Sequence, residues 1–287
     1  MEDCPKDLAL GEMWLGLDVT LKAITLDTIG KFQFVLGIFS QTGGGKGNLI
    51  SGAVKSLLGT WIKKTGSHPY NFLILDAKGT DYFRILEEFN GKTLNPIHFD
   101  ELTEAVETLK AYVDEVNNYR RYLSENRVSV SHWFQIKDRF PQLKPIPRPL
   151  LLLCDETTQY LQPRPSIKIT KESTEAQKQL KAKYDLEEEL AFLVNTILQL
   201  FRSSGVVVIV ATQASREGDL NLDRTNIKNL CIGQQNSVMS RALTGSDIAE
   251  DSTLVRGRFI FSGDGQVARI QSPWVLDVPK KSAGKKS

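Results

Sequence analysis

Short apolar runs alternate with longer amphipathic stretches along this chain. Four runs have the length of a strand and no polar face, and they lie at 31–39, 70–79, 149–154 and 205–211. Strands that are apolar on both faces are covered on both faces, which is typical of parallel sheets. We therefore predict an α/β protein with a mostly parallel central sheet and helices on both faces.

Three stretches place apolar residues at helical spacing. The first, 48–64, directly follows the first strand and a glycine-rich loop. The second covers 99–127, and the third becomes amphipathic at Leu186 after a highly charged beginning. The early part of that charged segment has two open interpretations, a mobile segment or an exposed helix.

The remaining pattern divides the chain. Loose alternation near the start predicts a small N-terminal β-region within 1–30, and the main domain is expected over 31–275. This domain contains a charged insertion at 166–185 and ends with closing strands that include a Gly-Asp-Gly hairpin turn. A basic tail of low complexity, 276–287, is expected to be disordered.

Composition excludes several classes of protein. The net charge of +2 means that any nucleic-acid contact comes from a local patch. The three cysteines are scattered without a CxxC pair, which argues against a disulfide framework or a zinc site and fits a reducing cytosol. The N-terminus has no basic region typical of a secretory signal, and no apolar run approaches the roughly 20 residues of a membrane helix. We expect a cytoplasmic protein without a membrane span of its own.

The glycine-rich stretch between the first strand and the first helix has the features of a phosphate-binding loop. Gly43, Gly44 and Gly45 allow consecutive backbone N–H groups to face a ligand, and Lys46 follows at the start of the helix. In the pattern G-x-x-x-x-G-K-[ST], such a lysine reaches the β- and γ-phosphates of a nucleotide. We assign nucleotide binding to this loop and the first helical residues: Thr42, Gly43, Gly44, Gly45, Lys46, Gly47 and Asn48.

Two positions depart from that pattern. Ser40 replaces the first glycine, which is a mild change because serine fits many tight turns. Gly47 replaces the hydroxyl residue that normally ligates Mg²⁺. A water molecule or the neighbouring Asn48 are the two candidates to fill that position. The loop alone is therefore compatible with a working site, with a defective one, or with a turn that only resembles one.

Polar side chains follow the other apolar strands. Asp155 and Glu156 end the strand at 149–154, where the first carboxylate would support Mg²⁺ and the second would activate the attacking water. Gln213 follows another strand and is placed to contact the γ-phosphate or that water. Taken singly, an acidic pair also begins many solvated loops, and an amide also ends many strands. Because ligands of open α/β sheets lie beyond the carboxyl ends of the strands, we expect one shared site.

The order of motifs resembles the motor domain of FtsK/SpoIIIE-type DNA translocases, within the FtsK–HerA superfamily of P-loop ATPases. "FSQTGGGKGNLISGAVKSLL" resembles the Walker A loop with its helix, and "PLLLLCDETTQYL" resembles Walker B. Four more segments follow the family order, and the resemblance covers roughly Leu15 to Val275: "NFLILDAKGTDY", "AVETLKAYVDEVNNYRRYLSENRVSVSHWFQIK", "FRSSGVVVIVATQ" and "NIKNLCIGQQNSVMSRALTGSD".

This resemblance implies a RecA-like sheet, ATP and Mg²⁺ as cofactors, and a hexameric ring of identical subunits around double-stranded DNA. Lys46 would bind phosphate, Asp155 would support the metal, Glu156 would activate water and Gln213 would act as sensor. Arg202 and Arg241 match family arginines offered to the neighbouring subunit. The loop at 214–229 lies where the family contacts DNA, and its basic residues would meet phosphates without reading sequence: Arg216, Arg224 and Lys228.

Gly47, the insertion at 166–185, and the lack of the family's membrane anchor and winged-helix module are departures. We expect an ATP-driven DNA translocase of a mobile element, of the conjugative transfer or genome packaging type. A membrane-bound or relaxase-type component of a transfer apparatus is the expected partner. Two alternatives stay open: a nucleotide-binding scaffold subunit that hydrolyses ATP weakly or not at all, and a secretion ATPase that moves protein.

Overall fold

The computed structural model describes residues 4–31, 34–76, 82, 102–213 and 221–273. Within them lies one nine-stranded sheet with the order β2-β1-β9-β8-β7-β3-β6-β5-β4. Its five adjoining strands from β7 to β4 are parallel, and the other four are antiparallel. The predicted α/β class and mostly parallel centre are confirmed. The bounds are β1 Glu12–Asp18, β2 Ala23–Asp27, β3 Val35–Phe39, β4 Asn71–Asp76, β5 Leu150–Asp155, β6 Val207–Thr212, β7 Asn229–Ile232, β8 Arg258–Gly263 and β9 Gln266–Gln271.

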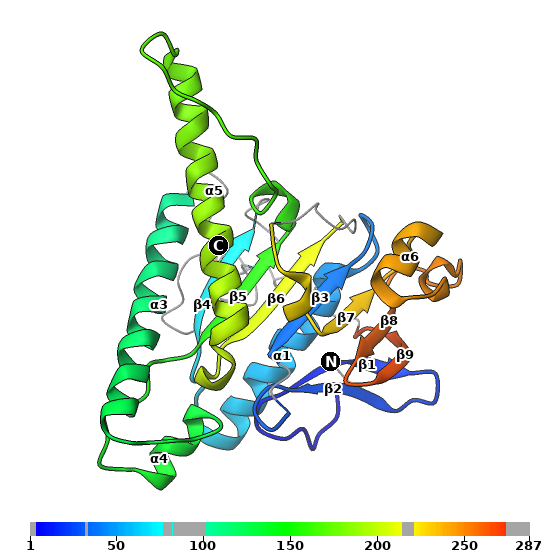
Figure 1. The fold of residues 1–287 in the computed structure, drawn as a ribbon. Helices are drawn as coiled ribbons and strands as arrows, with labels where there is room; N and C mark the ends of the chain where they lie inside the picture. The colour runs from blue at the N-terminus through cyan, green and yellow to red at the C-terminus, as the bar shows by residue number, and fades with distance from the viewer. Residues whose placement is uncertain (1–3, 32–33, 77–81, 83–101, 214–220, 274–287) are drawn as a thin grey trace, which may run out of the picture.

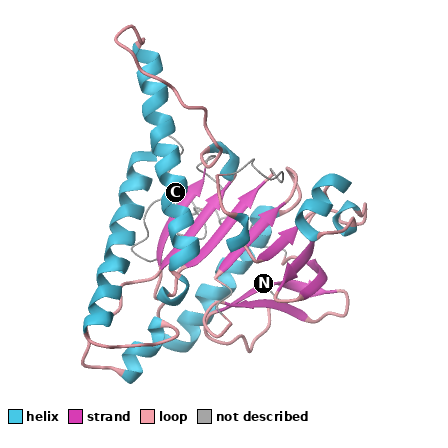
Figure 2. Ribbon diagram, viewed as in Figure 1, coloured by secondary structure: helices cyan, strands magenta, loops and turns pink. Residues whose placement is uncertain are grey.

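Helices cover both faces of the parallel part (Figure 1). Helix α1 (Lys46–Thr65) packs on one face, where its buried side chains join those of β1, β3 and β4 in one core cluster. Helices α3 (Leu102–Glu125) and α5 (Glu175–Leu200) lie side by side on the other face (Figure 2) and complete a second cluster. The central strands β3, β5 and β6 are buried along their whole length, as their apolar composition predicts.

The predicted N-terminal β-region pairs with β9. Strand β1 pairs antiparallel with both β2 and β9, and the Trp14 backbone N–H donates a hydrogen bond of 2.8 Å to the Ser56 hydroxyl in α1. The predicted Gly-Asp-Gly turn joins β8 to β9 with Asp264 and Gly265 at its centre, both with positive φ. The antiparallel strands therefore continue the central sheet and contact α1. The expected tail at 276–287 lies outside the described residues.

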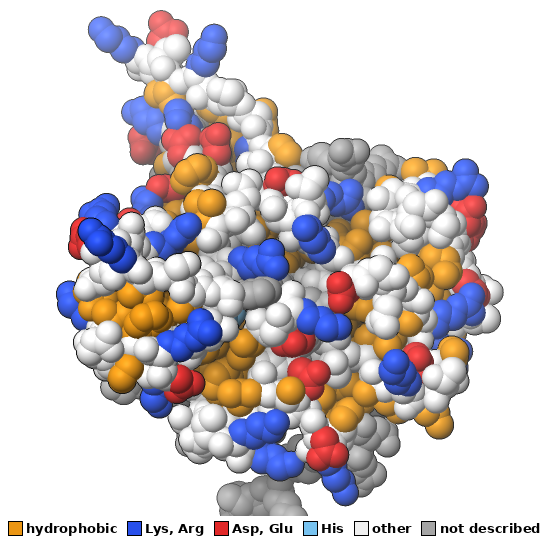
Figure 3. Space-filling model, turned by 60° about the horizontal axis from the view of Figure 1, so that its bottom comes forward, with side chains coloured by type: hydrophobic (Ala, Val, Ile, Leu, Met, Phe, Trp, Pro, Cys, Tyr) orange, Lys and Arg blue, Asp and Glu red, His pale blue; other side chains and the backbone are white. Residues whose placement is uncertain are grey.

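Helix α5 extends beyond the sheet (Figure 1). Its start is fixed by a capping box in which Thr174 and Gln177 exchange side-chain to backbone hydrogen bonds. The first buried residue of α5 is Glu187, whose carboxylate pairs with Arg164. The charged segment is thus an exposed helix from Glu175 onward, and the projection carries basic and acidic side chains together (Figure 3).

Two shorter helices complete the described fold. Helix α4 (Ile136–Arg139) follows α3, and α6 (Ser237–Thr244) follows β7 with Asn236 as its N-cap. The described helices include none with the length and apolar character that crossing a bilayer requires. Cys154 and Cys231 are fully buried in strands, where they serve as small core residues.

Candidate functional site

The glycine-rich loop leads from the carboxyl end of β3 into α1. Gly43 and Gly45 have φ angles of +79° and +97°, in the region that favours glycine. A Cβ on Gly44 would lie 2.0 Å from the Ser40 hydroxyl oxygen, so a side chain at position 44 would force Ser40 to shift. The Lys46 ammonium group donates a hydrogen bond of 2.7 Å to the Ser40 carbonyl oxygen. The loop therefore has the compact form that a phosphate-binding loop needs, with its lysine folded over it.

The predicted carboxylate pair lies at the end of β5, and both side chains are buried. Asp155 Oδ2 accepts a hydrogen bond of 3.0 Å from the Tyr82 hydroxyl, and Oδ1 accepts one of 3.0 Å from the Glu156 backbone N–H. Glu156 has φ 52° and ψ 51°, a left-handed conformation that costs a non-glycine residue about 1–2 kcal/mol. Such strain persists only where the surroundings hold it, and it is common at functional sites.

Gln213 joins the carboxylate pair to the glycine-rich loop. Its side-chain N–H donates to Glu156 Oε2 at 2.7 Å, and its Oε1 accepts from the Thr42 hydroxyl at 2.6 Å. The Thr158 hydroxyl donates to the second carboxylate oxygen, Glu156 Oε1, at 3.2 Å. Residues that follow β3, β5 and β6 are thus connected by hydrogen bonds at one edge of the sheet. The ends of β3, β5 and β6 therefore converge, as the sequence predicts.

A second layer of buried groups supports Asp155. Asp76 ends β4 directly opposite Asp155 in the strand register and is also buried. The Tyr160 hydroxyl lies 2.8 Å from the Leu75 carbonyl oxygen and 2.7 Å from that of Asp155, to which it donates. Burial raises the pKa of Tyr160 well above its usual value, so its proton stays in place. The carboxyl ends of β4 and β5 are therefore held together by donors from buried tyrosines.

The remaining position of the loop bears on metal binding. Gly47 lies in the first turn of α1, and a Cβ placed on it meets nothing within 4 Å. Asn48 follows it and is half-buried. Mg²⁺ takes oxygen ligands, usually one or two carboxylates together with substrate phosphates. The buried carboxylate of Asp155 fits this role, and no hydroxyl of α1 shares it at position 47.

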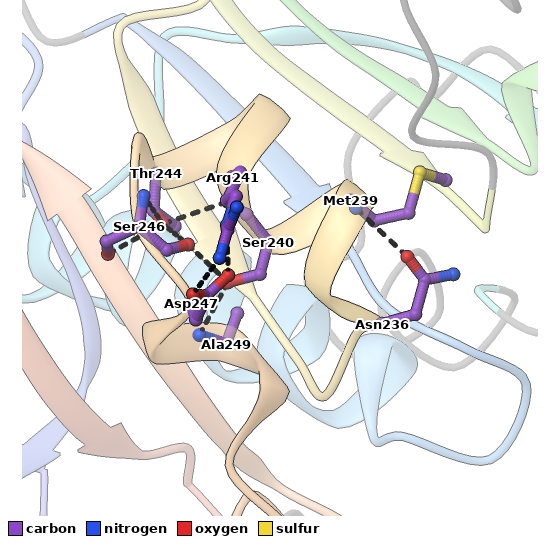
Figure 4. Close-up of polar contacts among 8 residues, drawn as sticks. All are labelled: Asn236, Met239, Ser240, Arg241, Thr244, Ser246, Asp247 and Ala249. Atoms are coloured by element: carbon purple, nitrogen blue, oxygen red, sulfur yellow. Dashed lines mark hydrogen bonds and ion pairs between the residues drawn. The ribbon is translucent and has the colours of Figure 1, made fainter.

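Two predicted arginines lie away from this cluster. Arg202 begins the short 3₁₀ turn Arg202–Ser204, which precedes β6, so it lies at the amino edge of the sheet. Arg241 lies on α6, where its guanidinium binds both carboxylate oxygens of Asp247 at 2.6 and 2.7 Å (Figure 4). This pair is exposed, and the pKa of Asp247 is lowered by the hydrogen bonds from Arg241. Neither arginine belongs to the hydrogen-bonded cluster around Gln213.

Of the three predicted DNA-contacting residues, the structure describes Arg224 and Lys228. The Arg224 guanidinium lies over the Phe39 ring, 5.4 Å from its centroid. Lys228 is exposed and precedes β7, whose first residue is level with Leu36 in the strand register. Arg216 lies outside the described residues.

Sequence reasoning missed two contributors. Tyr82 ends the family-like segment 71–82 without an assigned role, and only the fold brings its hydroxyl to Asp155. The Gly257 backbone N–H donates a hydrogen bond of 2.9 Å to the Gly44 carbonyl, although the two residues are far apart in the chain. For the hydrogen bond from Gly257, the available signal was the Arg-Gly-Arg sequence at 256–258, where the strand 258–263 begins. This tripeptide has no specific meaning by itself.

Comparisons with known proteins agree with this geometry. No protein-family model and no curated protein sequence matches the chain. Among solved structures, TcpA, the pCW3 conjugation coupling protein with ATPγS, has a TM-score of 0.68 at 17% identity, over 94% of this chain and 68% of TcpA. The cytoplasmic domain of EccC, the type VII secretion ATPase of Thermomonospora curvata, has a TM-score of 0.66 at 20% identity, over 98% of this chain.

The chain spans only 30% of that EccC chain. EssC (ATPases 2 and 3) from Geobacillus thermodenitrificans has a TM-score of 0.57 at 14% identity and matches 94% of this chain. At these identities the likeness establishes the fold. The expected α/β fold is confirmed, because these ATPase structures share it.

Proposed function

We propose that this protein is an ATP-driven motor that moves double-stranded DNA for a mobile element. The observation that carries the proposal is the chain of hydrogen bonds from Thr42 through Gln213 to Glu156. It joins a phosphate-binding loop to a carboxylate suited to activate water, across three strand ends. The likeness to the coupling protein TcpA supports the DNA-moving interpretation.

In this mechanism the loop 40–45 and the amino end of α1 bind the phosphates through backbone N–H groups. Lys46 turns from the Ser40 carbonyl to the β- and γ-phosphates when nucleotide enters. Asp155 would hold Mg²⁺, which would neutralise charge on the phosphates. Glu156 takes a proton from the attacking water, while Gln213 orients that water and Glu156.

Arg202 has a role only between subunits in this proposal. Because it lies at the amino edge of its own sheet, it reaches a phosphate site only by belonging to a neighbouring copy. A ring of identical subunits, with six as the expected number, supplies that arrangement. Arg241 is the second candidate and would first have to leave Asp247. An arginine from a neighbour stabilises charge on the transferred phosphoryl group.

Contacts with DNA are assigned to Arg216, Arg224 and Lys228, which surround the segment after Gln213. Such contacts neutralise phosphates and carry no sequence information. Because Gln213 directly precedes this segment, binding of DNA is coupled to the position of Glu156. A membrane-bound or relaxase-type component is the proposed partner at the transfer apparatus.

Two specific observations favour other functions. Gly47 removes a Mg²⁺ ligand, which favours a nucleotide-binding scaffold subunit with weak or no hydrolysis. The likeness to EccC and EssC favours an ATPase that moves protein. The three functions differ in two measurable quantities, which are the rate of ATP hydrolysis and its stimulation by duplex DNA.

The test is the ATPase rate of the full chain with and without random duplex DNA. We expect DNA to raise the rate, and Lys46→Ala and Glu156→Gln to abolish hydrolysis. Lys64→Ala, in an exposed position at the far end of the same helix, is the matched control and should match the wild type. Equal trace turnover in the wild type and both site variants would support the scaffold function instead.

Affinity for duplex DNA at rising salt separates the two cargoes. The apparent binding constant should fall steeply with salt, and neutralising Arg224 or Lys228 should reduce the logarithmic slope by about 1 each. Hydrolysis without DNA binding at any salt concentration would favour a protein cargo.

A further inference from the structure

The turn before β8 contacts the phosphate-binding loop directly. The Gly257 backbone N–H donates a hydrogen bond of 2.9 Å to the Gly44 carbonyl oxygen. A Cβ placed on Gly45 would lie 2.9 Å from the Gly257 nitrogen and 3.0 Å from its Cα. The turn and the loop are therefore in close backbone contact, and Gly45 leaves no room for a side chain between them.

This turn is held firmly from its other side. Gly257 has a φ of +83°, and its carbonyl oxygen accepts hydrogen bonds from the Ser272 backbone N–H at 2.8 Å and the Gln271 side-chain amide at 3.1 Å. Both donors stand at the end of β9. The turn is thus a fixed support between the antiparallel strands and the loop.

Arg256 is the charged residue that this support brings to the loop. Its side chain is exposed, and its Cγ atom lies 3.8 Å from the position of a Cβ on Gly45. The side chain of Arg256 therefore starts beside the backbone of Gly45, in the loop to which we assign phosphate binding. An arginine guanidinium is always charged and forms paired hydrogen bonds with phosphate oxygens.

The strand order shows on which side of the loop Arg256 lies. In the sheet, β8 and β7 lie on one side of β3, whereas β6 and β5 lie on the other. Gln213 and Glu156 follow β6 and β5, so the groups suited to the γ-phosphate and the attacking water occupy that second side. Arg256 flanks the loop from the first side, away from Gln213 and Glu156.

We propose that Arg256 is a nucleotide-binding residue that contacts the diphosphate portion common to ATP and ADP. Gly257 positions it by fixing the turn against Gly44. This assignment rests on the proposed nucleotide-binding function. It differs from the intersubunit role of Arg202, because a contact to the diphosphate stabilises bound ATP and bound ADP alike.

The test is a titration of the full chain with mant-ADP in the presence of Mg²⁺, followed by competition with unlabelled ADP and ATPγS. Arg256→Ala should weaken both nucleotides by a similar factor of about 10, and Arg256→Lys should lose less. Arg258→Ala is the matched control, because Arg258 lies two residues further on and donates instead to the Thr253 carbonyl at 3.3 Å. This control should bind as the wild type does.

The outcomes separate the inference from the function on which it rests. If the wild type binds neither nucleotide, the proposed function itself fails. If the wild type binds both and Arg256→Ala binds them equally well, Arg256 has no contact with nucleotide and the inference is wrong. A loss confined to ATPγS would also overturn it, because Arg256 would then contact the γ-phosphate.

Discussion

The Gln213 side-chain amide donates a hydrogen bond of 2.7 Å to the Glu156 carboxylate. With Thr158 on the other carboxylate oxygen, both oxygens of the proposed base are engaged. A carboxylate held in this way is oriented before any water arrives, and preorganised groups need no rearrangement at the moment of reaction. The same contact gives Gln213 control over the direction of Glu156.

Replacing Gln213 by alanine should lower kcat for ATP hydrolysis by about 100-fold, since a small displacement of a catalytic group costs that much. Nucleotide affinity should change little, because the phosphate contacts of the loop remain. Steady-state rates together with a fluorescent-nucleotide titration measure the two effects separately. Thr158→Ala is the companion variant, and it should lower kcat less because Gln213 stays. Wild-type kcat in Gln213→Ala would show that Glu156 needs no partner.

Position 47 allows a gain-of-function experiment. Because a Cβ at Gly47 meets nothing within 4 Å, Gly47→Ser should fit and restore a hydroxyl at the metal-facing position. We expect Mg²⁺-ATP affinity to rise by about 10-fold, which corresponds to ~1.4 kcal/mol. Gly47→Ala fills the same space without the oxygen and should bring no Mg²⁺-dependent gain. Identical affinities for the serine and alanine variants would mean that the metal is held by other ligands.

Tyr82→Phe tests the buried donor to Asp155. Removing the hydroxyl leaves one carboxylate oxygen without this hydrogen bond, so the free energy of unfolding should fall by about 1–2 kcal/mol. The Mg²⁺ concentration that gives half-maximal hydrolysis should shift as well, because Asp155 loses its orientation. Tyr160→Phe serves as control, since that hydroxyl donates to backbone carbonyls. A similar loss of stability with unchanged Mg²⁺ dependence is expected there. The same unchanged Mg²⁺ dependence in Tyr82→Phe would assign Tyr82 to stability alone.

His132 predicts how stability depends on pH. Burial lowers the pKa of His132 to about 4, from 6.5 in the unfolded chain. Between these values the unfolded state binds more protons than the folded state, so stability present above pH 6.5 is lost as pH falls toward 4. The loss is on the order of 3 kcal/mol. Urea unfolding at several pH values measures it, and His132→Gln should flatten the dependence in this window. An unchanged slope in His132→Gln would assign the acid sensitivity to carboxylates.

The central sheet was predictable because apolar runs such as 149–154 fill their strands completely. They show none of the apolar and polar alternation of a strand with one exposed face. The carboxyl-edge cluster was predictable for a related reason. Parallel strands end at the same edge, so polar residues directly after them converge. This rule alone was enough to predict that Gln213 and Glu156 lie close together.

Contacts between distant segments were not predictable in this way. The hydrogen bond from Gly257 to Gly44 depends on how the antiparallel strands extend the sheet past β7, and local spacing carries no trace of that order. Tyr82 contacts Asp155 through packing between neighbouring strand ends. For Arg202 the motif is recognisable in the sequence. Its place at the amino edge of the sheet follows only from the direction of β6.

Helix α5 begins three turns before its first buried residue, with an N-cap that is complete without the rest of the domain. The segment Glu175–Asp185 is therefore exposed to solvent and does not pack into the core. Packing in the core places no constraint on its sequence or its length. Whole turns can be added or removed at Glu175–Asp185 while β5 and β6 keep their register. Natural variation in this chain's relatives and engineered tags alike should concentrate there.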